Sequence, residues 1–338
     1  MNIALIGLGM VANTHVAAIN DSALPLSLCG VLGRDPARTA AFAAKHGTRT
    51  YDNLEQIAQD KTVDFVILAT PPDARSDIVQ TLAAAGKPIL MEKPVERNLT
   101  AATRIVKICE AAGVPLGIVF QHRARAASIA LKQEIEAGTL GTISSVELRV
   151  PWWRDQAYYD APGRGTYARD GGGVMISQAI HTLDLALWLL GPASSLQAMM
   201  RTTPLHQLEA EDWAGALLEW QNGAIGTFMA TTAAAPGAPE TISIHGTKAS
   251  AHLGSGMLTI TWPDGTSRTT GANSTTGGGA DPMAFTHEWH QSVIEDFATS
   301  LTEGRPPMAS GRDALHSHRV IDAMERANDT AIPTIINT

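Results

Sequence analysis

The sequence of 338 residues has few cysteines and no long apolar run, and each shortage excludes a class of protein. Its two cysteines, Cys29 and Cys109, form neither a CxxC pair nor a disulfide framework, which is typical of a reducing compartment. It lacks any run of about 18 apolar residues, so no membrane span is predicted. The apolar amino terminus has no basic region and no cleavage signature, so we expect no signal peptide and a cytoplasmic protein.

Charge is scarce as well, since charged residues make up 17% of the chain and the formal net charge is −8. Without a run of Lys and Arg, the chain lacks the basic surface that binds phosphate backbones, so no nucleic-acid partner is expected. Hydrophobic residues at 44% indicate a well-buried globular protein. One core rarely reaches this length, so the sequence predicts two domains.

Short apolar runs alternate with helical patterns over residues 1–121. Runs such as VDFVILAT are apolar without alternation, as in parallel strands that are covered on both faces. This repetition predicts an α/β Rossmann domain with a doubly wound parallel sheet. The expected strands are Ile3–Ile6, Leu26–Leu32, Val63–Ala69, Pro88–Met91 and Val114–Phe120, with helices at Ala37–Lys45, Ile78–Ala85 and Ala101–Ala112.

The pattern changes near Gln121, so residues 122–338 are assigned to a second domain for substrate binding and oligomerisation. Alternating strands and hairpin signals at Gln221–Gly223 and Pro263–Gly265 favour an antiparallel sheet. Thr269–Ala280 is rich in Gly, Thr and Ser and predicts a flexible loop. The expected strands are Thr142–Val150, Leu196–Arg201, Trp213–Trp220, Ala224–Thr231 and Thr241–His245, with helices at Ile129–Ala137, Glu288–Leu301 and Arg312–Ala327.

A GLGMVA motif at residues 7–12 follows the first strand and opens the first helix. Gly7 permits a tight turn, Gly9 lets the backbone approach a pyrophosphate, and the small Ala12 allows close helix packing. The helix N-terminus adds amide donors and the positive end of a dipole. In this context the motif predicts a nicotinamide dinucleotide site rather than a plain glycine turn.

The ribose of the cofactor is expected near Gly33 and Arg34, at the end of the second strand. An acidic side chain there would favour NAD, whereas an arginine suits the 2′-phosphate of NADP. These residues favour NADP(H), with NAD(H) possible and a merely solvated Arg34 as the plainer interpretation. Asp35 is explained more simply as a helix N-cap, because Pro36 is a good first helical residue.

Glu92, Lys93 and Pro94 directly follow the apolar strand Pro88–Met91. Charges at the carboxyl end of a parallel strand point toward the crevice in which such folds bind ligands. A positively charged nicotinamide ring disfavours the ammonium form of a neighbouring lysine, which suits proton handling or polarisation of a hydroxyl. The residues expected to bind the cofactor are Gly7, Gly9, Met10, Val11, Ala12, Gly33, Arg34, Thr70, Pro71, Glu92, Lys93 and Gln121.

Ser177, His181 and Asp184 are spaced to share one face of a helix that follows three glycines, Gly171–Gly173. The glycines would let a substrate approach the backbone closely. His181 ionises in the range needed to exchange a proton with an alcohol, although it is also open to a purely structural role. Asp184 is interpreted as an orienting or structural partner. A metal held by His181 and Asp184 would lack a third ligand, so no metal is expected.

Aromatic residues alternate with arginines before the three glycines, from Trp152 to Tyr167. This composition suits a pocket for a polyol or sugar acid, and it suits a domain rim or subunit contact equally well. The residues expected to bind substrate are Lys93, Tyr158, Arg164, Gln178 and His181, and those expected to act in catalysis are Lys93, His181 and Ser177.

Over nearly all of its length the chain resembles the Gfo/Idh/MocA family, the glucose–fructose oxidoreductase and inositol dehydrogenase group. The matching motifs are GLGMVA at Gly7, ATPP at Ala69, GKPILMEKP at Gly86 and GGGVMISQAIHTLDLALWLLG at Gly171. The resemblance implies a second α/β domain with a large open antiparallel sheet that joins subunits, so a homodimer or homotetramer is expected. It also implies that Lys93 binds the reacting hydroxyl and that His181 acts as acid and base.

Two positions depart from the family pattern, with Ser177 where an aspartate is usual and Arg75 where a histidine is common. The expected function is an NAD(P)-dependent oxidoreductase that transfers hydride between nicotinamide and a secondary hydroxyl or carbonyl. The substrate is expected to be a sugar, a cyclitol or a related acid, and Ser177 favours an anionic one. The alternatives are a nucleotide-sensing regulator of the same fold and a family enzyme that retains its cofactor.

Overall fold

The computed structural model describes residues 1–273, 278 and 285–336, and it divides the chain into two compact units. The first unit contains Met1–Gln121 and His287–Leu315, and the second contains His122–Thr286 and His316–Thr338. The sequence assigned all of residues 122–338 to the second domain, so the return of the chain at His287 corrects that assignment. Apolar packing is the reason, because Phe297 is fully buried and its ring centroid lies 5.2 Å from that of Phe65.

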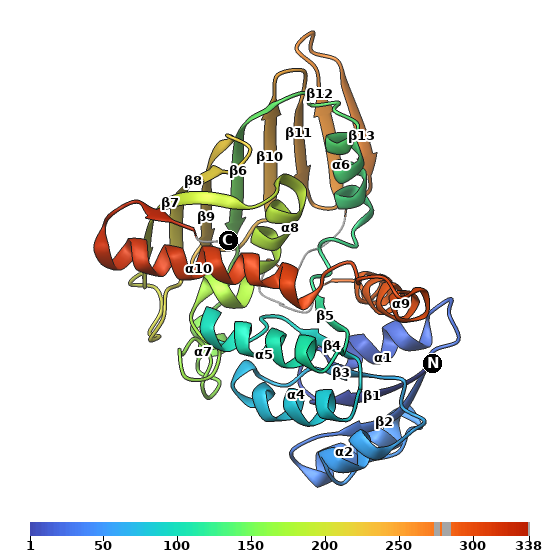
Figure 1. The fold of residues 1–338 in the computed structure, drawn as a ribbon. Coiled ribbons are helices and arrows are strands. Elements are labelled where there is room, and N and C mark those ends of the chain that lie inside the picture. Colours follow the sequence, from blue (N-terminus) through green and yellow to red (C-terminus); the bar gives the residue numbers. More distant parts are fainter. Residues whose placement is uncertain (274–277, 279–284, 337–338) are drawn as a thin grey trace. The chain divides into compact units, whose positions relative to one another are not determined.

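The first unit is built on a parallel five-stranded sheet in the order β2-β1-β3-β4-β5, with helices around it (Figure 1). Every residue of β3, β4 and β5 is buried, which explains why these strands are apolar without alternation. Ligands bind such sheets at the carboxyl ends of the strands, where the order reverses, here beside β1 and β3. The strands are β1 (Asn2–Ile6), β2 (Ser27–Leu32), β3 (Phe65–Leu68), β4 (Ile89–Glu92) and β5 (Leu116–Val119). The helices are α1 (Ala12–Asn20), α2 (Pro36–His46), α3 (Leu54–Gln59), η1 (Pro72–Ala74), α4 (Arg75–Ala84), α5 (Leu99–Ala111) and α9 (Glu288–Glu303).

Helix α2 begins as the sequence predicts. The carboxylate of Asp35 accepts a hydrogen bond of 3.0 Å from the backbone N–H of Arg38, and Pro36 is the first helical residue. The helix ends at Gly47, which has a positive φ of 64°. Asp35 is thereby confirmed as the N-cap of α2.

The second unit is built on a nine-stranded sheet in the order β13-β12-β11-β10-β6-β9-β8-β7-β14. Its neighbouring strands are antiparallel except for β6 and β9, so the mainly antiparallel sheet is confirmed. Helices α6 and α8 pack on one face of this sheet (Figure 1). The strands are β6 (Ile143–Pro151), β7 (Ala193–Arg201), β8 (Trp213–Trp220), β9 (Ile225–Thr231), β10 (Thr241–Gly246), β11 (Ser250–Gly254), β12 (Met257–Thr261), β13 (Ser267–Gly271) and β14 (Thr334–Ile335). The other helices are α6 (Ala126–Glu136), α7 (Gln156–Tyr159), η2 (Met175–Ala179), α8 (Ile180–Leu190) and α10 (Gly311–Thr330).

The segment expected as the loop Thr269–Ala280 is in part a strand. Thr269 pairs with Thr259 and Gly271 with Met257 in the β12–β13 ladder, so the loop assignment is wrong at its start. Residues 274–277 and 279–280 of the expected loop lie outside the described residues. Among the described residues, no helix is long and apolar enough to cross a membrane.

The face of the nine-stranded sheet opposite α6 and α8 carries exposed apolar side chains. Met199, Leu217, Ile225 and Ile335 are exposed at 52%, 60%, 60% and 67%, and strand register places them on the same face. Phe228, by contrast, is 2% exposed and belongs to the covered face. Their register neighbours on this face include Gln197, Glu219 and Thr227, so the exposed face mixes apolar and polar side chains, as many interaction surfaces do.

Candidate active site

The glycine turn between β1 and α1 contains glycines of two kinds. Gly7 has a φ of 96°, and a Cβ on it would lie 2.6 Å from the backbone of Ala69, so the fold itself requires this glycine. A Cβ on Gly9 would meet no described atom within 4 Å. The fold therefore leaves space at Gly9, as an approaching pyrophosphate requires. Ala12 is fully buried, as close helix packing demands.

Two buried oxygen atoms at the carboxyl end of the same sheet have no hydrogen-bond partner among the described residues. They are Oγ1 of Thr70, just after β3, and Oε1 of Gln121, just after β5. Buried polar atoms are nearly always hydrogen bonded, so such atoms mark a place where a polar ligand fits. Together with the space at Gly9, they show that these residues fit a dinucleotide.

At the end of β2, one carboxylate oxygen of Asp35 caps α2. Gly33 is required by packing, since a Cβ on it would lie 2.5 Å from the hydroxyl of Thr39. Arg34 is exposed, as is Met10 beside the glycine turn. Pro71 is exposed and precedes η1, while Val11 occupies the N-cap position of α1 without a side-chain cap.

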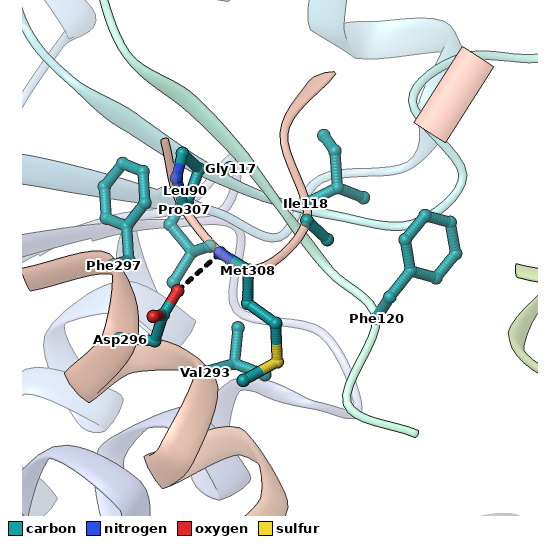
Figure 2. A pocket seen from close by; sticks show the side chains of 10 residues that line it. Leu90, Gly117, Ile118, Phe120, Val293, Asp296, Phe297, Pro307 and Met308 are labelled. Atoms are coloured by element: carbon teal, nitrogen blue, oxygen red, sulfur yellow. Dashed lines mark hydrogen bonds between the residues drawn. The ribbon is translucent and has the colours of Figure 1, made fainter. Parts of the chain in front are cut away.

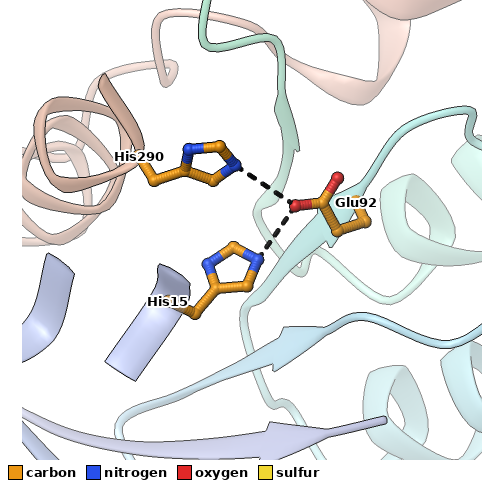
Figure 3. Close-up of side chains that lie close together, drawn as sticks. All are labelled: His15, Glu92 and His290. Atoms are coloured by element: carbon orange, nitrogen blue, oxygen red, sulfur yellow. Dashed lines mark hydrogen bonds and ion pairs between the residues drawn. The ribbon is translucent and has the colours of Figure 1, made fainter. Parts of the chain in front are cut away.

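Glu92 ends β4 between two buried histidines (Figure 3). Its Oε1 lies 2.9 Å from Nε2 of His15 and 3.7 Å from Nε2 of His290. Burial alone would raise the pKa of Glu92, but the two histidines outweigh it and hold that pKa well below its ordinary value. Burial also lowers the pKa of His290. The carboxylate of Glu92 is therefore engaged inside the first unit, and its expected contact with the cofactor stays a prediction.

The same three side chains place possible ligand atoms within 4.8 Å of one another, which would allow a metal ion. The short contact between Nε2 of His15 and Oε1 of Glu92 instead shows these groups hydrogen bonded to each other. Lys93 directly follows Glu92 in the chain and is half-buried. The carbonyl groups of Glu92 and Pro94 accept hydrogen bonds from the guanidinium of Arg75.

In the second unit, Ser177 lies in the π-helical turn η2 and His181 in the first turn of α8. The regular α-helix expected from Ser177 onward is therefore wrong at its start, and π turns of this kind often occur at functional sites.

The role expected for the glycines before this helix also changes, because a Cβ on Gly173 would lie 1.7 Å from the carbonyl oxygen of Glu211. The carboxylate of Glu211 accepts hydrogen bonds of 3.0 Å from the backbone N–H groups of Gly173 and Met175. Gly173 is thus a packing glycine that fixes the start of this helix.

His181 is buried and its ring stacks on that of His122, with centroids 4.8 Å apart and planes at 24°. Nε2 of His122 lies 4.0 Å from Oε1 of Glu240. Glu240 in turn accepts hydrogen bonds of 2.5 Å from Arg125 and 3.2 Å from Nε1 of Trp152. The ring of His122 therefore lies between the buried carboxylate of Glu240 and the ring of His181.

Asp184 has the structural role that the sequence suggested. Its two carboxylate oxygens accept hydrogen bonds of 2.7 Å and 2.6 Å from the guanidinium of Arg123, and both side chains are almost completely buried. This bidentate ion pair occupies the carboxylate.

Three residues expected to bind substrate lie together in the second unit. The hydroxyl of Tyr158 accepts hydrogen bonds of 2.5 Å from Arg164 and 3.2 Å from Nε2 of Gln178. The guanidinium of Arg164 also lies 4.2 Å from the centre of the Tyr158 ring, and that of Arg154 lies 5.5 Å away. Gln178 is 5% exposed, and its Oε1 has no hydrogen-bond partner among the described residues. The cluster therefore combines two cations, an aromatic face and an unused acceptor, as a site for a hydroxylated anion would.

Several residues of these clusters were not found from the sequence. His122 directly follows Gln121, and a titratable residue just after a parallel strand is a signal that could have been used. His15 lies on α1 one turn after Ala12, which is a weaker signal. Glu240 and His290 carry no local signal, because each meets its partners only through the fold.

A small cavity in the first unit is lined by Leu90, Ile118, Phe120, Val293 and other apolar side chains (Figure 2). Its acidic group, Asp296, already accepts a hydrogen bond of 2.6 Å from the backbone N–H of Met308. The cavity therefore offers little to a polar ligand and is not part of the candidate site.

Comparison with known proteins gives matches along most of the chain. The family described as "Oxidoreductase family, NAD-binding Rossmann fold" matches residues 1–120, and "GFO/IDH/MocA C-terminal domain" matches residues 129–252. D-apiose dehydrogenase of Rhizobium rhizogenes is 28% identical over 331 residues, covering 95% of this chain and 93% of the relative. Inositol 2-dehydrogenase of Rhizobium meliloti is 26% identical over 332 residues, covering 96% and 95%.

A similar solved structure is that of the WlbA dehydrogenase from Bordetella pertussis in complex with NADH and UDP-GlcNAcA. It is 27% identical, has a TM-score of 0.87, and the match covers 100% of this chain and 98% of that chain. The resemblance found in the GLGMVA, EKP and GGG motifs is thereby confirmed. The chain belongs to the Gfo/Idh/MocA family of nicotinamide-dependent oxidoreductases.

Proposed function

We propose that this oxidoreductase acts on a secondary hydroxyl or carbonyl of a sugar, a cyclitol or a sugar acid. The observation that carries the proposal is the dinucleotide-fitting end of the first sheet, where Lys93 directly follows β4. A bound nicotinamide cofactor would supply the hydride donor or acceptor. A screen of polyols, aldoses and sugar acids with NAD⁺ and NADP⁺, followed by the absorbance of reduced nicotinamide, tests the proposal. No turnover with any of these compounds would contradict it.

The protein side chains have separate tasks in this proposal. Lys93 binds the reacting hydroxyl, and His181 takes its proton during oxidation and returns it during reduction. Ser177 hydrogen bonds the substrate without adding negative charge. Tyr158, Arg164 and Gln178 hold the remainder of the substrate, with the unused Oε1 of Gln178 as an acceptor for a substrate hydroxyl.

The two arginines beside Tyr158 favour a substrate that carries a carboxylate or another anionic group. Arg154 is buried, which lowers its pKa, while Tyr158 and Arg164 are half-buried. Dehydrogenases among the relatives support an enzyme over a nucleotide-sensing regulator of the same fold. A cytoplasmic location remains our proposal for the site of action.

NADP(H) is expected to bind more tightly than NAD(H), although the similar WlbA structure contains NADH. Arg34 is exposed, so its guanidinium can pair with a 2′-phosphate, and one carboxylate oxygen of Asp35 is engaged as the cap of α2. Arg34→Ala should therefore weaken NADPH binding by about 10-fold or more and leave NADH binding nearly unchanged. Titration of both cofactors by fluorescence measures this. Arg38→Ala, which changes an exposed arginine in the first turn of α2, is the control, and equal wild-type affinities would refute the preference.

A homodimer or homotetramer is expected, joined through the face of the nine-stranded sheet that exposes Met199, Leu217, Ile225 and Ile335. Leu217→Glu combined with Ile225→Glu should dissociate it, because two charges would be buried on that face. Leu205→Glu changes an exposed leucine outside the sheet and serves as the control. Light scattering at micromolar concentration measures the mass, and a monomeric wild type would contradict the expectation.

A further inference from the structure

Arg75, the residue that stands where the family commonly has histidine, is almost completely buried at the first residue of α4. Its Nε and Nη2 donate hydrogen bonds of 3.0 Å and 2.7 Å to the carbonyl oxygen of Thr70. Its Nη1 donates to the carbonyl oxygens of Glu92, at 2.5 Å, and of Pro94. One guanidinium group thus joins the segment after β3 to the segment after β4.

The two carbonyl groups bound by Nη1 belong to the residues immediately before and after Lys93. The carbonyl of Glu92 belongs to the peptide group that precedes Lys93, and the carbonyl of Pro94 belongs to the peptide group that follows Pro94, so the same nitrogen restrains the backbone before and after Lys93. The carbonyl of Thr70 is restrained by the other two nitrogens, and the hydroxyl of that threonine is one of the unpartnered atoms described above. Arg75 therefore contacts both segments that the proposed function assigns to the nicotinamide end of the site.

Neither histidine nor lysine could reproduce this arrangement. A guanidinium presents five N–H donors in a rigid planar fork, whereas an imidazole has two ring nitrogens and an ammonium is a single point. Burial lowers the pKa of Arg75 to about 10, and the neighbouring carboxylates of Glu92, Glu96 and Asp73 oppose that change. The side chain consequently remains a cation at neutral pH.

We propose that Arg75 is a positioning residue that fixes the amine of Lys93 for reaction by holding the carbonyl groups of Glu92 and Pro94, the residues on either side of it. The inference rests on the proposed function, because Lys93 is its target. A positioning role differs from a general contribution to stability. Lys87, in the same unit, serves as an example of the latter. Lys87 is also buried and donates to two backbone carbonyls, of Asp60 and Val63, but before β4 begins.

Acylation of Lys93 by acetic anhydride across a pH series, measured by peptide mass spectrometry, tests the inference without any substrate. In Arg75→Lys and Arg75→Met the pH-independent acylation rate of Lys93 should change by about threefold or more, because the amine is no longer held in place. Lys87→Met should lower the melting temperature without altering this rate.

NADH affinity, measured by fluorescence, should fall in the Arg75 variants and remain unchanged in Lys87→Met. With a substrate that turns over, kcat in Arg75→Lys should fall by about tenfold or more, with a smaller change in KM. If Arg75→Met does not fold, Arg75→Lys alone decides the question. Loss of melting temperature with wild-type acylation of Lys93 would show Arg75 to be a structural residue and overturn the proposal. Altered acylation together with normal turnover of Lys93→Met would instead reject the proposed function and leave the positioning of Lys93 intact.

Discussion

Lys93→Met is expected to lower kcat by about a thousandfold while leaving the fold and the affinity for NADH near those of the wild type. Methionine has a similar length but has no proton and no charge to offer the reacting hydroxyl. If the amine acts more strongly in the transition state than in the ground state, the loss appears in kcat rather than in KM. Steady-state kinetics on a confirmed substrate, with cofactor titration and thermal melting, measure all three quantities.

Lys87→Met is the matched control for this experiment. It removes a buried ammonium at the opposite end of β4, where the group donates to the carbonyl oxygens of Asp60 and Val63. The control should melt at a lower temperature and retain kcat. Turnover by Lys93→Met within a few-fold of the wild type would remove Lys93 from the mechanism.

The sequence predicted those elements in which the polarity of neighbouring residues follows their burial. VDFVILAT predicted β3, and every residue of that strand is buried. The strand predicted at Trp213–Trp220 has the same bounds as β8. Ser267–Gly271 could not be found in this way, because all five of its residues are exposed. It is a strand only through backbone pairing with β12, which leaves no trace in side-chain polarity.

Long-range packing explains the remaining differences in the fold. The helix around Glu288–Leu301 was predicted from its apolar period, yet that period does not say which core the helix covers. Only the structure shows Phe297 against Phe65, and hence the return of the chain to the first unit. Domain boundaries that depend on such a return are not encoded in any single segment.

The candidate site shows the same limit. Gly7, Lys93 and His181 were found because each follows a recognisable local pattern in the sequence. The histidines around Glu92 lie 77 residues before it, at His15, and far beyond it, at His290, so only the fold brings them to the carboxylate. Arg75 was noticed as a departure from the family, but its hydrogen bonds to the peptide groups around Lys93 depend on the path of the backbone.

His181→Asn is expected to reduce turnover to near background, because asparagine keeps a hydrogen bond but cannot exchange a proton near neutral pH. The stacking partner His122 should keep the local structure in place, so the variant should melt close to the wild type. His245→Asn is the control, since His245 bonds Ser250 within the sheet and has no proposed role. Retention of turnover by His181→Asn would assign the proton transfer to another group.

Ser177→Asp tests the serine that stands where the resemblance to the family implies an aspartate. A carboxylate one helical turn before His181 would stabilise its protonated form and raise its pKa, since opposite charges favour the ionised state. If the neutral histidine accepts the proton, the acidic limb of kcat/KM for oxidation should move to higher pH. An acidic substrate should also bind more weakly, because the new carboxylate repels it.

Ser177→Asn separates charge from size in this test, because asparagine has the shape of aspartate without its charge. It should leave the acidic limb in place and weaken acidic and neutral substrates alike. Oε1 of Glu240 lies 4.0 Å from Nε2 of His122, and His181 stacks on the ring of His122. The wild-type site therefore already has a carboxylate near His181. The shift caused by Ser177→Asp should therefore be modest, about one pH unit or less. An unchanged pH profile and substrate ranking in Ser177→Asp would place Ser177 outside the site and leave the preference for an anionic substrate to the arginines beside Tyr158.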